Sequence, residues 1–218
     1  MNHYPSNPNH TFHFEDYFQG LSIQFDKGPF IREYLDRLYQ TLARALSEYK
    51  RVFAFRFDLR FPDHFNENNF NFDNQVIDRF VESFKAKIRH NRQMALRENM
   101  YAHDTVVRYV WAREFGEHGR PHFHFAILLN YDAFCSLGKF ESGRVNMFNR
   151  LQEAWASALK LPASDADGLV HFPAHCFYHL NREDNTGVAE FFYRASYLCK
   201  SATKLFGDGR HGFGSSRN

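Results

Sequence analysis

The chain has 218 residues, of which 44% are hydrophobic and 24% are charged, and its formal net charge is +2. These values are typical of one globular domain with short appendages, and no apolar run approaches the length of a membrane-spanning helix. The polar N-terminus lacks the basic start and apolar stretch of a secretion signal, so we expect a cytoplasmic protein. The three cysteines (135, 176 and 199) have no Cys-x-x-Cys spacing, which argues against a disulfide framework or a cysteine zinc site.

The first third of the chain predicts an arm, a helix and a strand. Residues 1–28 are interpreted as a flexible N-terminal arm, and residues 29–206 as a single domain. Apolar residues recur at helical spacing over 29–49, which predicts an amphipathic helix. Residues 51–61 alternate phenylalanines with small or polar residues, which predicts a strand with one apolar face.

The remaining elements follow in a regular alternation. We expect a basic helix from 75 to about 99, then two strands, 104–114 and 122–130, joined as a hairpin by a segment with Gly and Pro. A helix over 144–160, a strand within 168–180 that Pro173 limits, and a last helix over 188–205 complete the domain. Residues 207–218 are interpreted as a turn-rich tail.

This order predicts an α+β fold. After the first helix the series is βαββαβ, which builds a ferredoxin-like or RRM-like antiparallel sheet with helices on one face. The other face of the sheet is then expected to be free for a functional site.

A first candidate site is the pair His122 and His124 in an apolar strand. Residues two apart on a strand share a face, so the two imidazoles can bind one divalent ion. Antiparallel pairing of the hairpin would bring Glu114 or Glu117 beside them and complete a two-histidine, one-carboxylate site. The alternative is a pair of surface histidines on a half-exposed strand. With these ligand types, Mg²⁺ or Mn²⁺ is the expected ion.

A second candidate site is formed by Tyr193, Tyr197 and Lys200. On a helix these positions lie along one stripe, so two phenols and one ammonium would face the same way. A pair of tyrosines at this spacing also suits core packing, but a lysine in the same stripe suits a site that handles phosphate.

Together the two groups resemble a known pattern. His-hydrophobic-His on a strand, followed by Tyr-x-x-x-Tyr-x-x-Lys, resembles the His-hydrophobic-His (HUH) endonucleases that initiate rolling-circle replication. The GRPHFHF context is similar to initiators of small single-stranded DNA phages. The closing GFGSSR and the layout look like the inovirus-type replication proteins and their prophage-encoded YagK/YfjJ relatives. The resemblance covers about residues 50–215.

The resemblance implies roles for individual residues. His122 and His124 would bind the metal with Glu114, or with Glu117 as the fallback, because the spacing of the acid varies in the family. Tyr197 would be the nucleophile of a nicking and joining reaction through a 5′-phosphotyrosine, Tyr193 the second tyrosine, and Lys200 the motif lysine. The first strand motif of the family usually carries threonines, whereas this chain has FAFRFDLR, so no role carries over to Arg56 or Asp58.

The expected partners are DNA, as a single-stranded or hairpin origin, and a separate helicase, because the chain has no Gly-x-x-x-x-Gly-Lys-Ser/Thr phosphate loop. Basic residues concentrate in 78–98 and after 193, and they predict a surface that follows the DNA backbone. Its members would be Lys85, Arg89, Arg92, Lys204 and Arg210.

Two other functions fit parts of the sequence. A non-catalytic module that binds single-stranded nucleic acid would use the phenylalanine-rich sheet for base stacking. A metal hydrolase would instead use His171, His175 and His179, whose spacing of four would align them if the segment were helical.

Overall fold

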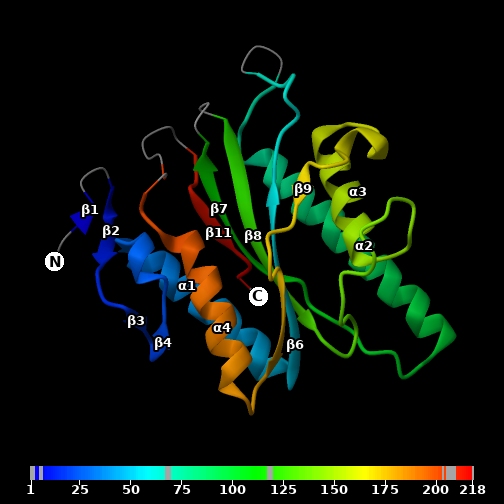
Figure 1. Cartoon of the computed structure of the whole chain (residues 1–218). Helices are drawn as coiled ribbons and strands as arrows, with labels where there is room; N and C mark the ends of the chain where they lie inside the picture. The colour runs from blue at the N-terminus through cyan, green and yellow to red at the C-terminus, as the bar shows by residue number, and fades with distance from the viewer. Residues whose placement is uncertain are drawn as a thin grey trace.

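The computed structural model describes residues 3–4, 7–66, 70–116, 120–202, 204 and 210–217. Its centre is a six-stranded antiparallel sheet in the order β10-β6-β8-β7-β11, with β9 pairing with β6 (Figure 1). The strands are β6 (Arg51–Leu59), β7 (Arg108–Phe115), β8 (Pro121–Asn130), β9 (Val170–His171), β10 (Phe177–Asn181) and β11 (Phe213–Ser215). The predicted α+β class with an antiparallel sheet is confirmed.

Helices cover both faces of the sheet, not one. α1 (Arg32–Glu48) and α4 (Asn185–Ser196) lie on one face, and α2 (Gln75–Glu98) and α3 (Met147–Leu159) lie on the other (Figure 1). The prediction of helices on one face and a free second face is therefore wrong. Its physical reason is visible in β6, where the large Phe53, Phe55 and Phe57 face α2 and α3 while Val52 and Ala54 are equally buried beneath α1 and α4. Small side chains on the second face let the helices pack closely and leave a weak pattern in the sequence.

The N-terminal segment folds onto this core. β1 (His3–Tyr4), β2 (Asn7–His13) and β5 (Phe30–Ile31) form a small sheet, and β3 (Tyr17–Phe18) pairs with β4 (Leu21–Ser22) before the short 3-10 helix η1 (Phe25–Lys27). Phe18 and Ile23 belong to the buried cluster beneath α1 and α4. In its described part, the segment predicted to be a flexible arm is thus an ordered extension of the domain.

The C-terminal elements also differ from the prediction. β11 pairs with β7 and extends the sheet, so the described end of the segment interpreted as a tail belongs to the domain. The last helix ends at Ser196, and the 3-10 turn η3 (Tyr197–Cys199) follows it. The chain just after this turn pairs with the N-terminal segment. Lys200 forms an antiparallel β-bridge with Phe30, and the Ser201 amide donates to the Pro29 carbonyl at 2.9 Å, so the backbone is extended here and the helix does not continue.

The strand predicted within 168–180 is divided in two. Pro173 and His175, whose φ is +52°, separate β9 from β10, and the 3-10 helix η2 (Ala163–Ala166) precedes them. Within the described part of the chain, no helix combines the length and the apolar character that a membrane crossing requires.

Candidate metal centre and tyrosine site

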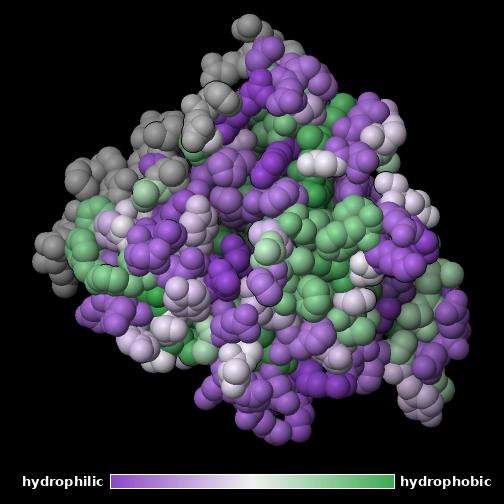
Figure 2. Space-filling view, viewed as in Figure 1, coloured by the Kyte–Doolittle hydropathy of each residue, from purple (hydrophilic) through white to green (hydrophobic). Residues whose placement is uncertain are grey.

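The candidate site lies where β7 ends and β8 begins, beyond the C-terminal end of α4. His122 and His124 project from the same face of β8 as Ala126 and Leu128, which are buried under α1 and α4. In the shared view of Figures 1 and 2, these sheet ends lie above α4 and to the left of β9, where Figure 2 shows mainly hydrophilic residues. The two histidines are half-buried and Glu114 is buried, so the site lies mostly beneath the surface at one end of a helix-covered face.

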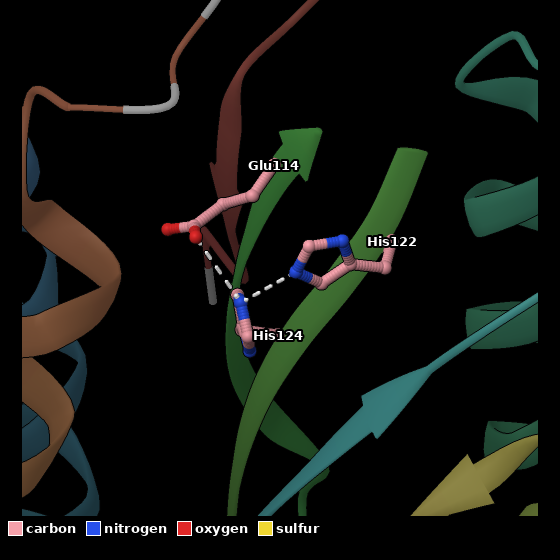
Figure 3. Close-up of side chains that lie close together, drawn as sticks. All are labelled: Glu114, His122 and His124. Carbon is pink, nitrogen blue, oxygen red and sulfur yellow. Dashed lines mark hydrogen bonds and ion pairs between the residues drawn. The ribbon is translucent and has the colours of Figure 1, made fainter. Parts of the chain in front are cut away.

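Glu114, His122 and His124 come together as the hairpin predicts. Glu114 pairs directly with His122 across β7 and β8, and Ala112 with His124 (Figure 3). The two imidazole Nε2 atoms are 3.1 Å apart, and His124 Nε2 is 3.3 Å from Glu114 Oε2. Glu117 lies outside the described residues.

This donor set fits a divalent ion. One ligand atom from each of the three residues lies within 4.8 Å of the others. Ligands about 2.1 Å from a metal and at right angles to each other lie about 3.0 Å apart, close to the His–His and His–Glu distances. The remaining pair, His122 and Glu114, lies within 4.8 Å, and two ligands of one such ion are at most about 4.2 Å apart, so these two side chains would close on the cation as it binds.

Asp58 of β6 supports the centre from the other side of His124. Its Oδ1 lies 2.6 Å from His124 Nδ1, so the ring donates from Nδ1 and directs Nε2 toward His122 and Glu114. Burial alone would raise the pKa of Asp58, but the hydrogen bond and charge of His124 lower it, so the carboxylate stays ionised. Asp58 Oδ2 also lies 3.5 Å from His171 Nδ1. Sequence alone predicts no role for Asp58, because the pairing that sets it opposite His124 joins residues 66 apart in the chain.

We expect Asp58→Asn to weaken Mn²⁺ binding by about 10- to 100-fold, because metal-binding histidines depend on the carboxylate that orients them. Isothermal titration calorimetry without DNA measures this directly. Asp63→Asn is the matched control, since Asp63 is an exposed acid whose salt bridge is to Arg120. Equal affinities of the Asp58 variant and the wild type would contradict the orienting role.

Two lysines neutralise the Glu114 carboxylate. Lys200 Nζ lies 3.0 Å from Oε2, and Lys204 Nζ lies 2.9 Å from Oε1. Glu114 is only 2% exposed, and burial alone would raise its pKa; the hydrogen bond from His124 and the charge of Lys204 instead hold the pKa far below the ordinary value. The prediction that Lys204 contributes to an exposed DNA-binding surface is wrong, because its side chain is fully buried on Glu114.

Removal of the Lys204 charge should destabilise the fold. We expect Lys204→Met to lower the free energy of unfolding by about 3 kcal/mol, because a buried ion pair that loses one partner leaves a charge without full compensation. Denaturant unfolding followed by circular dichroism measures the change. Lys85→Met, which breaks an exposed pair with Glu82, should cost less than about 1 kcal/mol. Similar values for both variants would contradict this account.

Tyr197 lies beside the three candidate ligands. Lys200 Nζ donates a hydrogen bond to the Tyr197 hydroxyl and lies 3.8 Å from the centre of its ring. The His124 ring meets the Tyr197 ring edge-on, with 5.6 Å between centroids. Tyr197 and Lys200 are thus brought to the centre as expected, but from a 3-10 turn and the residue after it, not from a continuous helix.

Tyr193 lies one helical turn before Tyr197 and is more open to solvent, at 37% exposure. Its backbone carbonyl accepts hydrogen bonds from Gln24 Nε2 at 3.1 Å and from the Ser196 hydroxyl at 2.7 Å. These contacts fix the backbone on which both tyrosines are carried, and Gln24 belongs to the segment that the sequence assigned to a flexible arm.

The other basic residues predicted to bind DNA lie away from the centre. Lys85, Arg89 and Arg92 are on α2, which packs on the opposite face of the sheet. Lys85 and Arg89 line a groove of about 540 Å³ with residues 215–217, whereas Arg92 donates to the His103 carbonyl. Arg210 is exposed and lies 3.4 Å from the Asn71 side chain. These residues do not form one surface with the histidines.

The alternative histidine set does not assemble on a helix. His171 is on β9, His179 is on β10, and His175 lies between them with a left-handed backbone. His179 Nε2 instead lies 3.0 Å from the Cys135 carbonyl. The metal-hydrolase interpretation that needed a helix at these positions is therefore wrong.

Comparison with known proteins identifies one matching family and two related proteins. The family model described as the YagK/YfjJ C-terminal domain matches residues 14–216. Two Escherichia coli K12 proteins, named uncharacterized protein YagK and uncharacterized protein YfjJ, are 33% and 32% identical to the chain. The alignments cover 90% of this chain in each case, and 98% and 100% of those proteins. No solved structure gives a significant match. The chain belongs to the YagK/YfjJ C-terminal domain family.

Proposed function

We propose that the protein is a metal-dependent DNA-nicking and DNA-joining enzyme of the HUH kind, which uses Tyr197 to form a 5′-phosphotyrosine link. One observation carries the proposal: Lys200 joins the Tyr197 hydroxyl to Glu114, the acid of the two-histidine, one-carboxylate cluster. The candidate nucleophile, a cation and the candidate metal site thus form one connected cluster of contacts. Initiation of rolling-circle replication of a phage, prophage or plasmid is the expected biological setting.

The metal-binding residues, Tyr197 and Lys200 have different roles in this proposal. A Mg²⁺ or Mn²⁺ ion held by His122, His124 and Glu114 would neutralise the scissile phosphate and polarise it. Attack on phosphorus places the phenolic oxygen of Tyr197 in the Tyr–O–P bond, and negative charge develops on that oxygen as its proton leaves. The ammonium of Lys200, which donates to the Tyr197 hydroxyl, can balance this charge.

The reaction that follows is a transesterification. The Tyr197 oxygen attacks phosphorus, a Tyr–O–P bond forms, and the bond from phosphorus to the 3′ oxygen breaks. The phenolic proton is lost to solvent, and the leaving 3′ oxygen takes up a proton to become a free hydroxyl. Attack of a 3′ hydroxyl on the phosphotyrosine reverses these steps and joins two strands. In this proposal Tyr193, which is more exposed than Tyr197, would act on a second junction.

A denaturing gel tests the proposal. The protein is mixed with a 5′- or 3′-labelled single-stranded oligonucleotide from its own replicon, with Mn²⁺ or with EDTA. We expect a covalent adduct only with Mn²⁺, and only with the label 3′ of the nick, because the 5′ phosphate stays on the protein. Binding that is independent of metal and yields no adduct would instead support the non-catalytic binding module.

The pH dependence of metal binding should reveal one competing proton. Burial lowers the pKa of His122 to about 4, so this ring is already neutral. Burial also opposes the charge of His124, but its hydrogen bonds to Asp58 and Glu114 outweigh this and raise its pKa. A metal must displace the His124 proton below that pKa, so Mn²⁺ affinity should rise about tenfold per pH unit as pH increases from about 5 toward neutrality. Calorimetry across this range checks the slope; a hundredfold rise per unit would mean that both histidines compete.

A further inference from the structure

Lys200 occupies the junction between the metal ligands and the tyrosine. Its ammonium lies 3.0 Å from Glu114 Oε2 and also contacts the Tyr197 hydroxyl. The same Glu114 oxygen is the one that lies 3.3 Å from His124 Nε2. Lys200 therefore shares the carboxylate oxygen that a cation between Glu114 and His124 would bind.

A divalent ion and this ammonium compete for one oxygen. Like charges a few ångströms apart repel strongly in a buried setting, where water screens them poorly. Lys200 is buried, so its ammonium needs an acceptor within the protein if it leaves Glu114. The Tyr197 oxygen, which it already contacts, is such an acceptor.

The backbone around Lys200 is anchored, so a side-chain movement suffices. Lys200 bridges to Phe30, and the next residue donates to the Pro29 carbonyl. Leu198 and Cys199, which precede it, are fully buried. Lys204 differs, because it binds the other carboxylate oxygen, Oε1, and its side chain has no exposed surface.

We propose that Lys200 exchanges between two acceptors: it neutralises Glu114 when the centre lacks a cation, and a divalent ion bound by Glu114, His122 and His124 moves it fully onto the Tyr197 oxygen. Lys200 is then a positioning residue that links metal binding to the nucleophile, because its charge is shared with Glu114 until the phosphate-binding ion is present. The inference rests on the proposed metal centre.

A double-mutant cycle on Mn²⁺ affinity tests the exchange without DNA or activity. The proteins are the wild type, Lys200→Met, Tyr197→Phe and the double variant, measured by calorimetry or by electron paramagnetic resonance of free Mn²⁺. We expect Lys200→Met to bind Mn²⁺ at least about tenfold more tightly, because no ammonium must be displaced. Tyr197→Phe should bind several-fold more weakly, about threefold or more, because the displaced ammonium loses its acceptor. In the Lys200→Met background, Tyr197→Phe should have no effect.

Lys204→Met is the matched control for charge. It removes the same charge from the same carboxylate, but Lys204 is not the lysine that contacts Tyr197. Tyr197→Phe should therefore still weaken binding in the Lys204→Met background as it does in the wild type. Thermal unfolding verifies that each variant is folded, and Lys200→Gln replaces Lys200→Met if the latter is not.

The outcomes separate this inference from the proposed function. The exchange is overturned if Tyr197→Phe changes Mn²⁺ affinity equally with and without Lys200. It is also overturned if Lys200→Met does not bind Mn²⁺ more tightly. Either result holds even when the wild type nicks DNA. The expected coupling with no adduct on any oligonucleotide supports the exchange and overturns the nuclease proposal. A wild type that binds no Mn²⁺, or that binds it independently of His122 and His124, overturns both.

Discussion

Tyr197→Phe is expected to abolish the covalent protein–DNA adduct, with a loss of at least about 10³-fold in the rate of adduct formation. Phenylalanine keeps the ring that packs against His124 and removes the oxygen that accepts from Lys200. The variant should therefore fold normally and still bind DNA. Without that oxygen, the Tyr–O–P bond cannot form at this position.

The measurement is the denaturing gel with Mn²⁺ and labelled single-stranded DNA, and mass spectrometry of the digested adduct identifies the modified tyrosine. Tyr193→Phe is the matched control, because it removes the same atom one helical turn away. This control should keep the first cleavage and lose the second one needed for a complete joining cycle. An adduct that survives replacement of both tyrosines would exclude them as nucleophiles.

The parts of the site that the sequence predicts are those set by local geometry. Alternation along a strand puts His122 and His124 on one face, and a short hairpin puts Glu114 opposite His122, so the three candidate ligands follow from residues at most ten apart. The sequence also predicts that Tyr197 and Lys200 lie together, although the helix expected to carry them ends before Tyr197. Their contact survives because a 3-10 turn keeps residues three apart close together.

The parts that the sequence could not predict depend on distant segments. Asp58 meets His124 only through the pairing of β6 with β8, and its alternation with buried phenylalanines indicated a polar position without a partner. Lys204 looked like a surface cation, because nothing in its neighbours reveals that Glu114 lies buried against it. The second helix-covered face of the sheet carries the small residues Ala54, Ala112 and Ala126, whose weak hydrophobic pattern does not indicate burial. Tertiary contacts, not local periodicity, decide each of these features.

The second large effect is expected from His122→Ala combined with His124→Ala. Two of three protein ligands are lost, so we expect Mn²⁺ affinity to fall by at least about a hundredfold and adduct formation to become undetectable. Both quantities should be measured on one preparation, and its thermal unfolding tests whether β8, which is buried apart from the two half-buried histidines, tolerates the changes.

The matched control is His90→Ala combined with His179→Ala, which removes two exposed imidazoles, one from α2 and one from β10. If this control binds Mn²⁺ and nicks DNA like the wild type, the loss of both activities in the first variant is specific to His122 and His124. It is then not an effect of removing any two histidines. Because the phosphate must be neutralised for an anionic phenolate to approach it, Tyr197 and Lys200 alone should not sustain the reaction when the histidines are gone. Mn²⁺-dependent adduct formation by the variant without His122 and His124 would therefore remove the basis for the metal centre, and with it the reason for placing a nucleophile there.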